Sequence, residues 1–254
     1  MTYAKYPSLA GRVVLVTGGA SGIGADMVRA FAGNDAKVAF LDIKVEAGRA
    51  LVDELSAAAH APLFLECDLV DIAALRVAVA SVRERLGPVA VLVNNAANDQ
   101  RQAVAELTPD EWDLSQNINL RPHFFAAQAV QPQMKELGFG SIVNFSSIAW
   151  RAGADQMVAY ASAKAAVIGL TRALARAFGD DNIRVNAIEP GAVMTERQRQ
   201  LWYPNEASID AIVRRQAIKH VLLGEEIART ALFLAADDSR MITKQSIAVD
   251  AGLR

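Results

Sequence analysis

The chain is poor in cysteine, which excludes an intramolecular disulfide. Cys67 is the single cysteine among 254 residues, and it ends an apolar run in which we expect it to pack passively. The segment from Met1 to Leu9 contains no apolar run, so a secretory signal is not expected. No apolar stretch in the sequence is long enough to cross a bilayer. We therefore expect a cytoplasmic protein with no membrane partner.

The patterns that mark several other classes of protein are also missing. Three histidines, His60, His123 and His220, are scattered without metal-ligand spacing, so no metal site is predicted. The net charge of −2 is interspersed along the chain, with no basic stripe for a nucleic-acid partner. The Gly-x-Ser-x-Gly elbow of a serine hydrolase is absent, and so is the Gly-Lys-Ser/Thr sequence of an ATP-binding P-loop.

The pattern that remains is typical of an α/β protein. Hydrophobic residues make up 52% of the chain, enough for one large core. Short apolar runs alternate with longer helical patterns, which predicts a parallel sheet covered by helices on both faces. With no repeat and no linker-like segment, we predict a single domain over residues 1–254. The predicted strands are Val13–Gly18, Lys37–Asp42, Pro62–Asp68, Ala90–Asn95, Ser141–Ser146, Arg184–Ile188 and Ser246–Asp250, and the predicted helices cover residues 22–33, 46–59, 71–86, 110–137, 157–179 and 224–236.

Two further segments carry local signals. Thr108–Glu111 combines a capping threonine, a proline at the first helical position and a glutamate three residues after the cap. This combination predicts the start of the fourth helix. Residues 195–220 break the alternation of strands and helices and contain Trp202, Tyr203 and Pro204. We predict that this segment is a lid over the substrate.

A glycine-rich turn follows the first predicted strand and opens the first predicted helix. It runs from Thr17 to Gly24 and has glycine at four positions. Glycine allows a tight turn and a close approach of the backbone to a pyrophosphate at the helix N-terminus. Such turns also occur for purely structural reasons, but this placement between a buried strand and a helix favours a dinucleotide site.

Polar residues follow the next strands. Asp42 lies eighteen residues after Gly24, near the position at which an acid binds the adenosine ribose. A carboxylate there would repel the extra phosphate of NADP and favour NAD, whereas a helix cap is the alternative role and the nearby Lys44 has the opposite charge. Asp68 ends the third strand and could cap a helix or contact adenine. Asn94–Ala97 ends the fourth strand with small residues that leave room for a cofactor, although a plain turn is the alternative.

A tyrosine and a lysine are spaced for acid–base chemistry. Tyr160 and Lys164 are four residues apart and so share one helical face. There the ammonium would lower the phenol pKa from its ordinary value of about 10 toward the working range of a base. Ser147 ends the fifth strand, and its hydroxyl could hold a substrate oxygen beside Tyr160, with Ser146 as the competing choice. The set predicts that the protein removes a proton from an alcohol.

These motifs together resemble the short-chain dehydrogenase/reductase family, from Gly11 to the C-terminal Asp250-Ala251-Gly252. The resemblance implies a Rossmann-like, doubly wound parallel sheet of about seven strands. It implies that Tyr160 is the acid/base, that Lys164 is its partner and a ribose ligand, that Ser147 positions the substrate, and that Asn119 holds a water in a proton relay. It also implies a homotetramer. The chain departs from the family pattern at Ala97, at Thr243-Lys244 and at Ala251, which leaves the catalytic set intact.

Motif and resemblance together define the predicted cofactor site, with NAD as the cofactor. Its members lie at or after the ends of the first four and the sixth predicted strands, or on the helix of Tyr160. They are Gly18, Ser21, Gly22, Ile23, Gly24, Asp42, Ile43, Asp68, Leu69, Asn95, Ala96, Tyr160, Lys164, Pro190, Gly191, Val193 and Thr195.

A narrower set of segments is similar to bacterial aldose 1-dehydrogenases of the D-xylose type. They include Asn98–Arg101, Ile148–Trp150, Thr195–Gln198 and Trp202-Tyr203. The likeness implies oxidation of a cyclic aldose at C1 by NAD, and the alternatives are a secondary-alcohol or polyol dehydrogenase, a ketone reductase, or a non-catalytic NAD-binding regulator. Polar groups and indole faces are plausible sugar contacts, and each could instead serve packing or a surface loop. The predicted substrate residues are Asn98, Asp99, Ser147, Trp150, Gln156, Tyr160, Arg197 and Trp202.

Overall fold

The computed structural model describes residues 3–253, and residues 1, 2 and 254, at the ends of the predicted domain, lie outside the described residues. Seven strands form one sheet in the order β3-β2-β1-β4-β5-β6-β7, and every neighbouring pair is parallel. The strands are β1 Val13–Thr17, β2 Lys37–Asp42, β3 Leu63–Glu66, β4 Val89–Asn94, β5 Gly140–Phe145, β6 Ile183–Pro190 and β7 Ser246–Val249. The predicted doubly wound parallel sheet of seven strands is confirmed.

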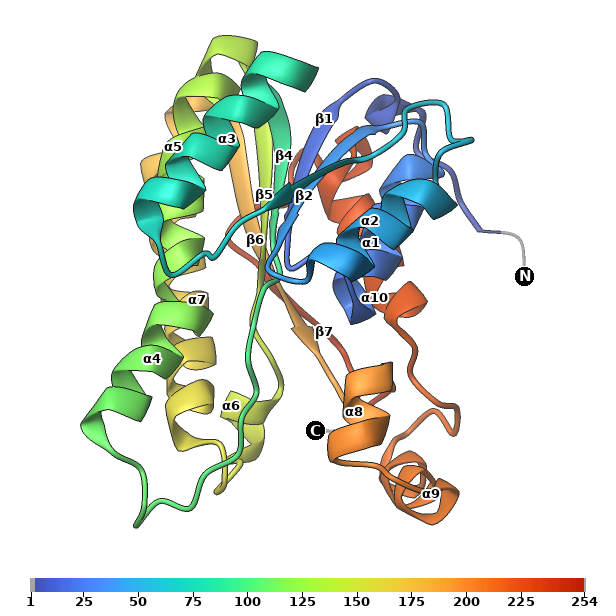
Figure 1. Ribbon diagram of the computed structural model, residues 1–254, viewed down its shortest axis with the longest axis vertical. Helices are drawn as coiled ribbons and strands as arrows, with labels where there is room; N and C mark the ends of the chain where they lie inside the picture. Colours follow the sequence, from blue (N-terminus) through green and yellow to red (C-terminus); the bar gives the residue numbers. More distant parts are fainter. Residues whose placement is uncertain (1–2, 254) are drawn as a thin grey trace.

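Helices cover both faces of this sheet (Figure 1). The helices α1, α2 and α10 pack on one face, and α3, α5 and α7 pack on the other. Two apolar clusters fill these two layers, which is why β1 and β4 are buried along their whole length and consist of consecutive apolar residues. The helices are α1 Gly22–Ala32, α2 Val45–Glu54, α3 Ile72–Leu86, α4 Pro109–Asn119, α5 Arg121–Leu137, α6 Ala149–Ala152, α7 Val158–Ala177, α8 Glu196–Leu201, α9 Glu206–Arg215 and α10 Gly224–Ala235.

The prediction of one helix over residues 110–137 is wrong, because two helices, α4 and α5, meet at Leu120. The backbone of Leu120 leaves the helical region, with φ −128° and ψ −54°. Pro122 lies at the start of α5 and has no N–H to continue the helical ladder. The break places Asn119 at the C-terminal end of α4, where its buried side chain can turn toward a loop. The start of α4 was predicted correctly, since Thr108 and Glu111 form the expected capping box.

Other differences are smaller. The helix predicted over 46–59 ends at Glu54, and the segment 195–220 contains two helices, α8 and α9, which the alternation of apolar runs does not indicate. The four-residue helix α6 after β5 was not predicted.

In residues 3–253 no helix combines the length and the apolar character needed to span a membrane.

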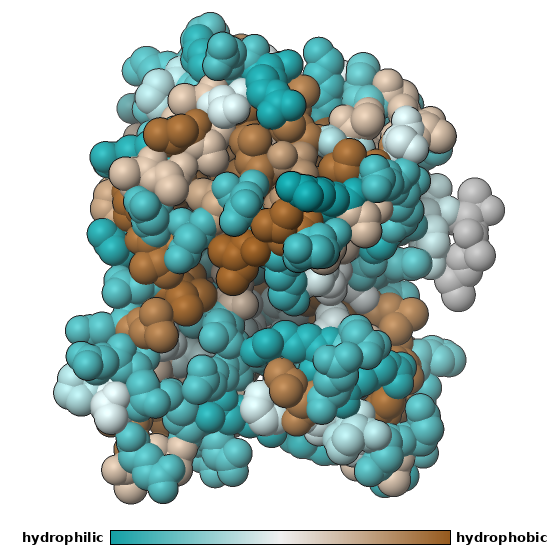
Figure 2. Space-filling model, in the orientation of Figure 1, coloured by the Kyte–Doolittle hydropathy of each residue, from teal (hydrophilic) through white to brown (hydrophobic). Residues whose placement is uncertain are grey.

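The carboxyl ends of the strands meet at one end of the molecule, where α6, α8 and α9 lie (Figure 1). In open parallel sheets ligands bind at this edge, and the change of direction between β1 and β4 marks the usual place. Figure 2 shows that this side of the molecule is hollowed between the sheet and the α8–α9 segment. Apolar side chains such as Leu114 and Phe124 are exposed on α4 and α5. The structure describes a single chain, so the predicted homotetramer stays a prediction.

Candidate active site

The glycine turn joins β1 to α1 at the carboxyl edge of the sheet, and its glycines allow close packing. A Cβ at Gly18, where φ is +66°, would lie 2.7 Å from the Cα of Ala96. A Cβ at Gly24 would lie 1.8 Å from the Gly18 carbonyl oxygen. Ser21 precedes α1 without making a capping hydrogen bond, so the first N–H groups of the helix are available to an anion. These features fit the pyrophosphate of a dinucleotide.

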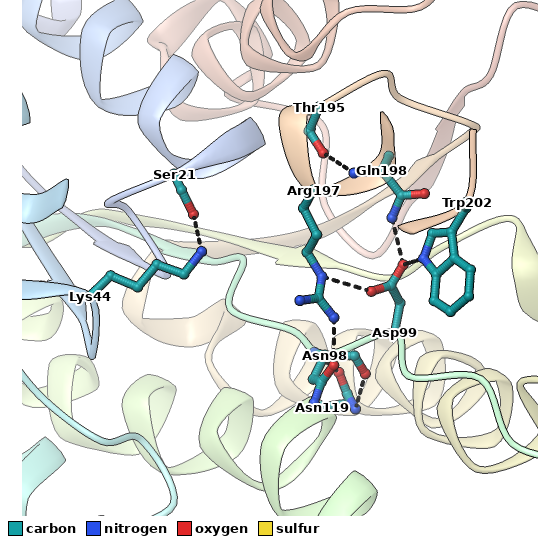
Figure 3. A network of polar contacts seen from close by, with 9 residues as sticks. All are labelled: Ser21, Lys44, Asn98, Asp99, Asn119, Thr195, Arg197, Gln198 and Trp202. Atoms are coloured by element: carbon teal, nitrogen blue, oxygen red, sulfur yellow. Dashed lines mark hydrogen bonds and ion pairs between the residues drawn. The ribbon is translucent and has the colours of Figure 1, made fainter. Parts of the chain in front are cut away.

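One carboxylate and one ammonium flank this turn. The Asp42 carboxylate accepts hydrogen bonds from the backbone N–H groups of Ala20 at 2.9 Å and Lys44 at 3.1 Å. The Lys44 ammonium donates to the Ser21 hydroxyl at 3.1 Å (Figure 3). A negative group at the end of β2 would repel a 2′-phosphate, and a positive group beside Ser21 would attract one. The two charges therefore act in opposite directions on the choice between NAD and NADP.

The ends of β3 and β4 complete this edge. Asp68 is exposed, and its carboxylate accepts from the Val70 N–H at 3.0 Å. The cap of α3 is Asp71 and not Asp68, so of the two predicted roles of Asp68 the contact with adenine stays a prediction. The Asn95 amide donates to the carbonyls of Thr17 and Gly18, both at 3.0 Å. These bonds fix the end of β4 against the glycine turn. Of the remaining predicted cofactor residues here, Leu69 is buried, and Ile43 is 66% exposed at the end of β2.

The segment after β6 lies against the same turn. The methyl carbon of Thr195 lies 3.3 Å from the position that a Cβ at Gly22 would take. Thr195 also caps α8 by accepting from the Gln198 N–H at 3.3 Å. Gly191 donates its N–H to the Val249 carbonyl at 2.9 Å, and Val193 is buried. The structure thus brings the predicted residues 190–195 to the glycine turn, with the start of the predicted lid directly behind them.

Ser147, Tyr160 and Lys164 converge from β5 and α7. The Lys164 ammonium donates to the Phe145 carbonyl at 2.8 Å and lies 5.6 Å from the centroid of the Tyr160 ring. A side-chain hydrogen bond joins Ser147 to Tyr160. Ser146, the competing serine, is buried and donates to the Lys164 carbonyl at 2.6 Å. Ser147 is therefore the serine that shares a site with the phenol.

The protein groups around Tyr160 raise the pKa of its phenol. The prediction that these groups lower the phenol pKa is therefore wrong. Burial raises the phenol pKa most, the negative charge of Asp99 raises it further, and the hydrogen bond from Ser147 lowers it. Lys164 is not among the groups that shift the phenol pKa, and its own side chain is buried. Burial lowers the Lys164 pKa to about 7, and Asp99 opposes that shift. Near neutral pH the amine thus carries only part of a full positive charge.

Asn119 is fully buried at the end of α4, and its side chain holds a loop. Its carbonyl oxygen accepts from the Asn98 N–H at 2.9 Å, and its amide donates to the carbonyls of Asn98 and Ser115, both at 3.0 Å. The side chain therefore fixes the loop after β4, in which the predicted substrate residues begin. The water that the resemblance implies for Asn119 stays a prediction.

Asp99 joins the loop after β4 to the predicted lid. It accepts from Gln198 Nε2 at 2.5 Å, Trp202 Nε1 at 3.3 Å and Arg197 Nε at 3.3 Å (Figure 3). Arg197 also donates to the Asn98 side chain at 3.0 Å. The structure thus brings together four of the predicted substrate residues, Asn98, Asp99, Arg197 and Trp202, in one network of polar contacts.

Two other predicted substrate residues lie outside that network. The indole N–H of Trp150 donates to Glu189 at 3.0 Å, and the Arg151 guanidinium covers one indole face at 4.4 Å from the ring centroid. Gln156 is exposed, and its backbone carbonyl accepts from the Gln102 N–H at 2.8 Å. Arg101 covers one face of Trp202 in the same way, at 4.0 Å. A guanidinium thus occupies one face of each indole that was predicted to offer a flat face to a sugar ring.

Comparison with known proteins decides the family. A family model described as enoyl-(acyl carrier protein) reductase matches residues 18–254. The chain is 48% identical over 251 residues to a probable galactose dehydrogenase of Rhizobium meliloti, with 98% of each chain covered. The chain belongs to the short-chain dehydrogenase/reductase family. It is also 44% identical to a D-xylose 1-dehydrogenase of Caulobacter vibrioides over the whole length of both chains.

A solved structure supports the same assignment. A blue fluorescent protein from a metagenomic library, determined in complex with NADPH, superposes with a TM-score of 0.88 and 38% identity, covering 97% of this chain and 99% of that one. Members of the short-chain dehydrogenase family use NAD or NADP. In this dehydrogenase the glycine turn, the start of α1 and the carboxylate of Asp42 are the groups that fit such a cofactor.

Sequence reasoning missed two residues of the dehydrogenase site. Gln198 makes the shortest of the Asp99 contacts, and Glu189 binds Trp150 and Arg151. Gln198 lies three residues after Thr195 in the sequence, so its capping position was the available signal. Glu189 carried a weaker signal, an acidic residue near the end of the sixth strand, immediately before Pro190. Its partners lie 38 and 39 residues away and cannot be read from spacing.

Proposed function

We propose that this protein is an NAD-dependent aldose 1-dehydrogenase, which oxidises a cyclic aldose at C1 to the aldonolactone. The observation that carries the proposal is the Asp99 network, a group of polar side chains whose carboxylate is near enough to Tyr160 and Lys164 to raise the pKa of both. The two relatives named galactose dehydrogenase and D-xylose 1-dehydrogenase support it, since they match over almost the whole chain at 48% and 44% identity.

The proposed chemistry assigns one task to each catalytic residue. The C1 hydroxyl hydrogen-bonds Ser147 and Tyr160, and Tyr160 takes its proton while the C1–H bond breaks. NAD, when bound, supplies the acceptor for the hydride and its two electrons. The ammonium form of Lys164, 5.6 Å from the centroid of the Tyr160 ring, stabilises the phenolate electrostatically, and its burial strengthens this attraction. Asn119 holds the loop that carries the substrate-binding residues.

The polar side chains that hydrogen-bond one another in the Asp99 network would bind the sugar. The carboxylate of Asp99 and the amide of Asn98 are suited to accept hydrogen bonds from vicinal hydroxyls, and Arg197 and Gln198 are suited to donate them. The open face of Trp202 could stack against the ring. The residues 195–220 act in this proposal as the substrate lid, because three of the Asp99 contacts come from α8 and the residue that follows it.

The preference for NAD rests on Asp42. Replacing Asp42 by alanine removes the charge that repels a 2′-phosphate and leaves Lys44 in place, so we expect weaker NAD binding and a gain for NADP. Lys44→Ala is the matched control and should shift the ratio the other way. Steady-state kinetics with both cofactors measure the ratio of kcat/KM values, and an unchanged ratio in Asp42→Ala would reject the assignment.

The decisive test is NADH formation by the purified protein with a panel of sugars and polyols. The panel contains D-xylose, L-arabinose, D-galactose, L-fucose and L-rhamnose. Strong activity with one aldose and a lactone product would support the proposal. Activity on a polyol or secondary alcohol alone would keep the catalytic residues and reject the aldose as substrate. No turnover of any alcohol would favour the regulator.

A further inference from the structure

Glu189 is a buried carboxylate with several donors at the edge of the candidate active site. Its side chain has no exposed surface, yet it belongs to β6 immediately before Pro190. It accepts from Arg151 Nε at 2.7 Å, Arg151 Nη2 at 3.0 Å and Trp150 Nε1 at 3.0 Å. Burial by itself raises the Glu189 pKa, but hydrogen bonds from Arg151, Ser246 and Trp150 outweigh this and lower it. The carboxylate is therefore ionised and fully engaged at neutral pH.

Trp150 and Arg151, the residues that donate to Glu189, belong to α6, a helix too short to be stable by itself. It has four residues, and isolated helices of that length are unstable in water. Among residues 3–253, the side-chain hydrogen bonds from α6 to the rest of the chain go to Glu189. The Arg151 guanidinium also stacks on the Trp150 ring. One carboxylate thus anchors both polar side chains of this helix.

The helix begins directly after the catalytic serine. The Ser147 hydroxyl accepts from the Ala149 N–H at 3.1 Å. The Ile148 N–H donates to the Pro190 carbonyl at 3.1 Å. Ser147 therefore lies between β5 and α6. The turn from Ser147 into α6 is attached to β6 at two neighbouring residues, Glu189 through side chains and Pro190 through the backbone.

We propose that Glu189 is a positioning residue for the substrate: through Trp150 and Arg151 it holds α6, and with α6 the hydroxyl of Ser147, at the carboxyl edge of the sheet. It touches neither of the proposed reacting groups and acts through the turn that carries Ser147. The glycine turn and Asp42 lie on the ends of other strands, so a loosened α6 should affect the substrate and spare the cofactor. The inference rests on the proposed function for the choice of substrate.

Amide hydrogen exchange across residues 148–153 tests the anchor without any need for activity. Glu189→Gln keeps the size of the side chain but loses the charge, and Arg151→Met removes the guanidinium. Both should speed exchange in this segment by roughly tenfold, the effect of losing about one hydrogen bond to a charged group. Arg83→Met is the matched control, because Arg83 also forms a 2.7 Å ion pair, with Glu136, and is similarly exposed. Equal exchange in wild type and both α6 variants would overturn the proposal.

Kinetics separate positioning from general stability. With the best substrate of the panel, Arg151→Met and Trp150→Phe should raise the substrate KM by about tenfold while the Kd for NAD changes less than twofold. Arg151→Lys retains a cation and should recover part of the loss. Equal weakening of substrate and cofactor, or no change in KM, would overturn the proposal. If Glu189→Gln does not fold, these three variants still decide it.

The two proposals fail in different ways. If the wild-type protein turns over no aldose but oxidises another alcohol, the proposed substrate class is rejected and the KM comparison is made with that alcohol. If it turns over nothing, the exchange measurement alone decides the role of Glu189. If an aldose is oxidised and the α6 variants match wild type, the anchor fails and the proposed function stands.

Discussion

The proposed cofactor side and the proposed substrate side of the site are built in different ways. On the cofactor side, the glycine turn, Asn95 and Asp42 engage backbone groups at the ends of neighbouring strands. On the substrate side, Asp99 meets side chains of Arg197, Gln198 and Trp202, which are 98 to 103 residues away in the sequence. The first region depends on the strand ends and on the turns that directly follow them. The second depends on two loops meeting, so it can change substrate without disturbing the fold.

Tyr160→Phe should give the largest effect on activity. It should slow the chemical step while leaving the binding of cofactor and substrate largely intact. Without the phenol hydroxyl there is no acid/base, and we expect kcat to fall by roughly 10²- to 10⁴-fold. NAD binding, measured by titration, should change little because the ring remains. Tyr3→Phe, at an exposed tyrosine near the N-terminus, is the matched control and should retain activity. Near-normal turnover in Tyr160→Phe would refute the assignment of the base.

Gly24→Ala should damage the cofactor side next most strongly. The added methyl would lie 1.8 Å from the Gly18 carbonyl oxygen and 2.8 Å from the Asn95 amide, so the turn must shift. We expect the Kd for NAD to rise by at least about tenfold, in line with overpacking costs of about 1–3 kcal/mol. Gly169→Ala on α7 meets nothing within 4 Å and should leave binding unchanged. An intact NAD affinity in Gly24→Ala would show that the turn is not a cofactor contact.

Asp99→Asn should change the substrate side and the pH profile together. Asp99 raises the pKa of both Tyr160 and Lys164, so its neutralisation lowers both. The rise of kcat/KM with pH should therefore shift to lower pH, whichever member of the coupled pair dominates the profile. The sugar KM should rise several-fold as contacts to Arg197 weaken. Asp238→Asn, at an exposed position remote from this network, is the control, and an upward or absent shift in Asp99→Asn would contradict the assignment.

Particular residues show how far sequence reasoning reached. Gly18, Asp42, Ser147 and Lys164 were found because each follows a strand or repeats at helical spacing, and their neighbours in space are set by parallel strands ending at one edge. The break at Leu120 was missed because a helical pattern continues across it, although Pro122 marked the place. Gln156 lies in a loop, where side-chain direction has no period; its side chain is exposed, and its contact with substrate stays a prediction.

The sequence by itself determined the sheet, its order of elements and the set of residues proposed as catalytic, because apolar periodicity and strand-end position are local properties. The tertiary structure decided which charges meet. It placed Asp99 against α8, buried Lys164 so that its pKa falls to about 7, and paired Glu189 with Arg151 and Trp150. Burial and electrostatic contact depend on distances between segments far apart in the chain, and those distances exist only once the two layers of helices have packed onto the sheet.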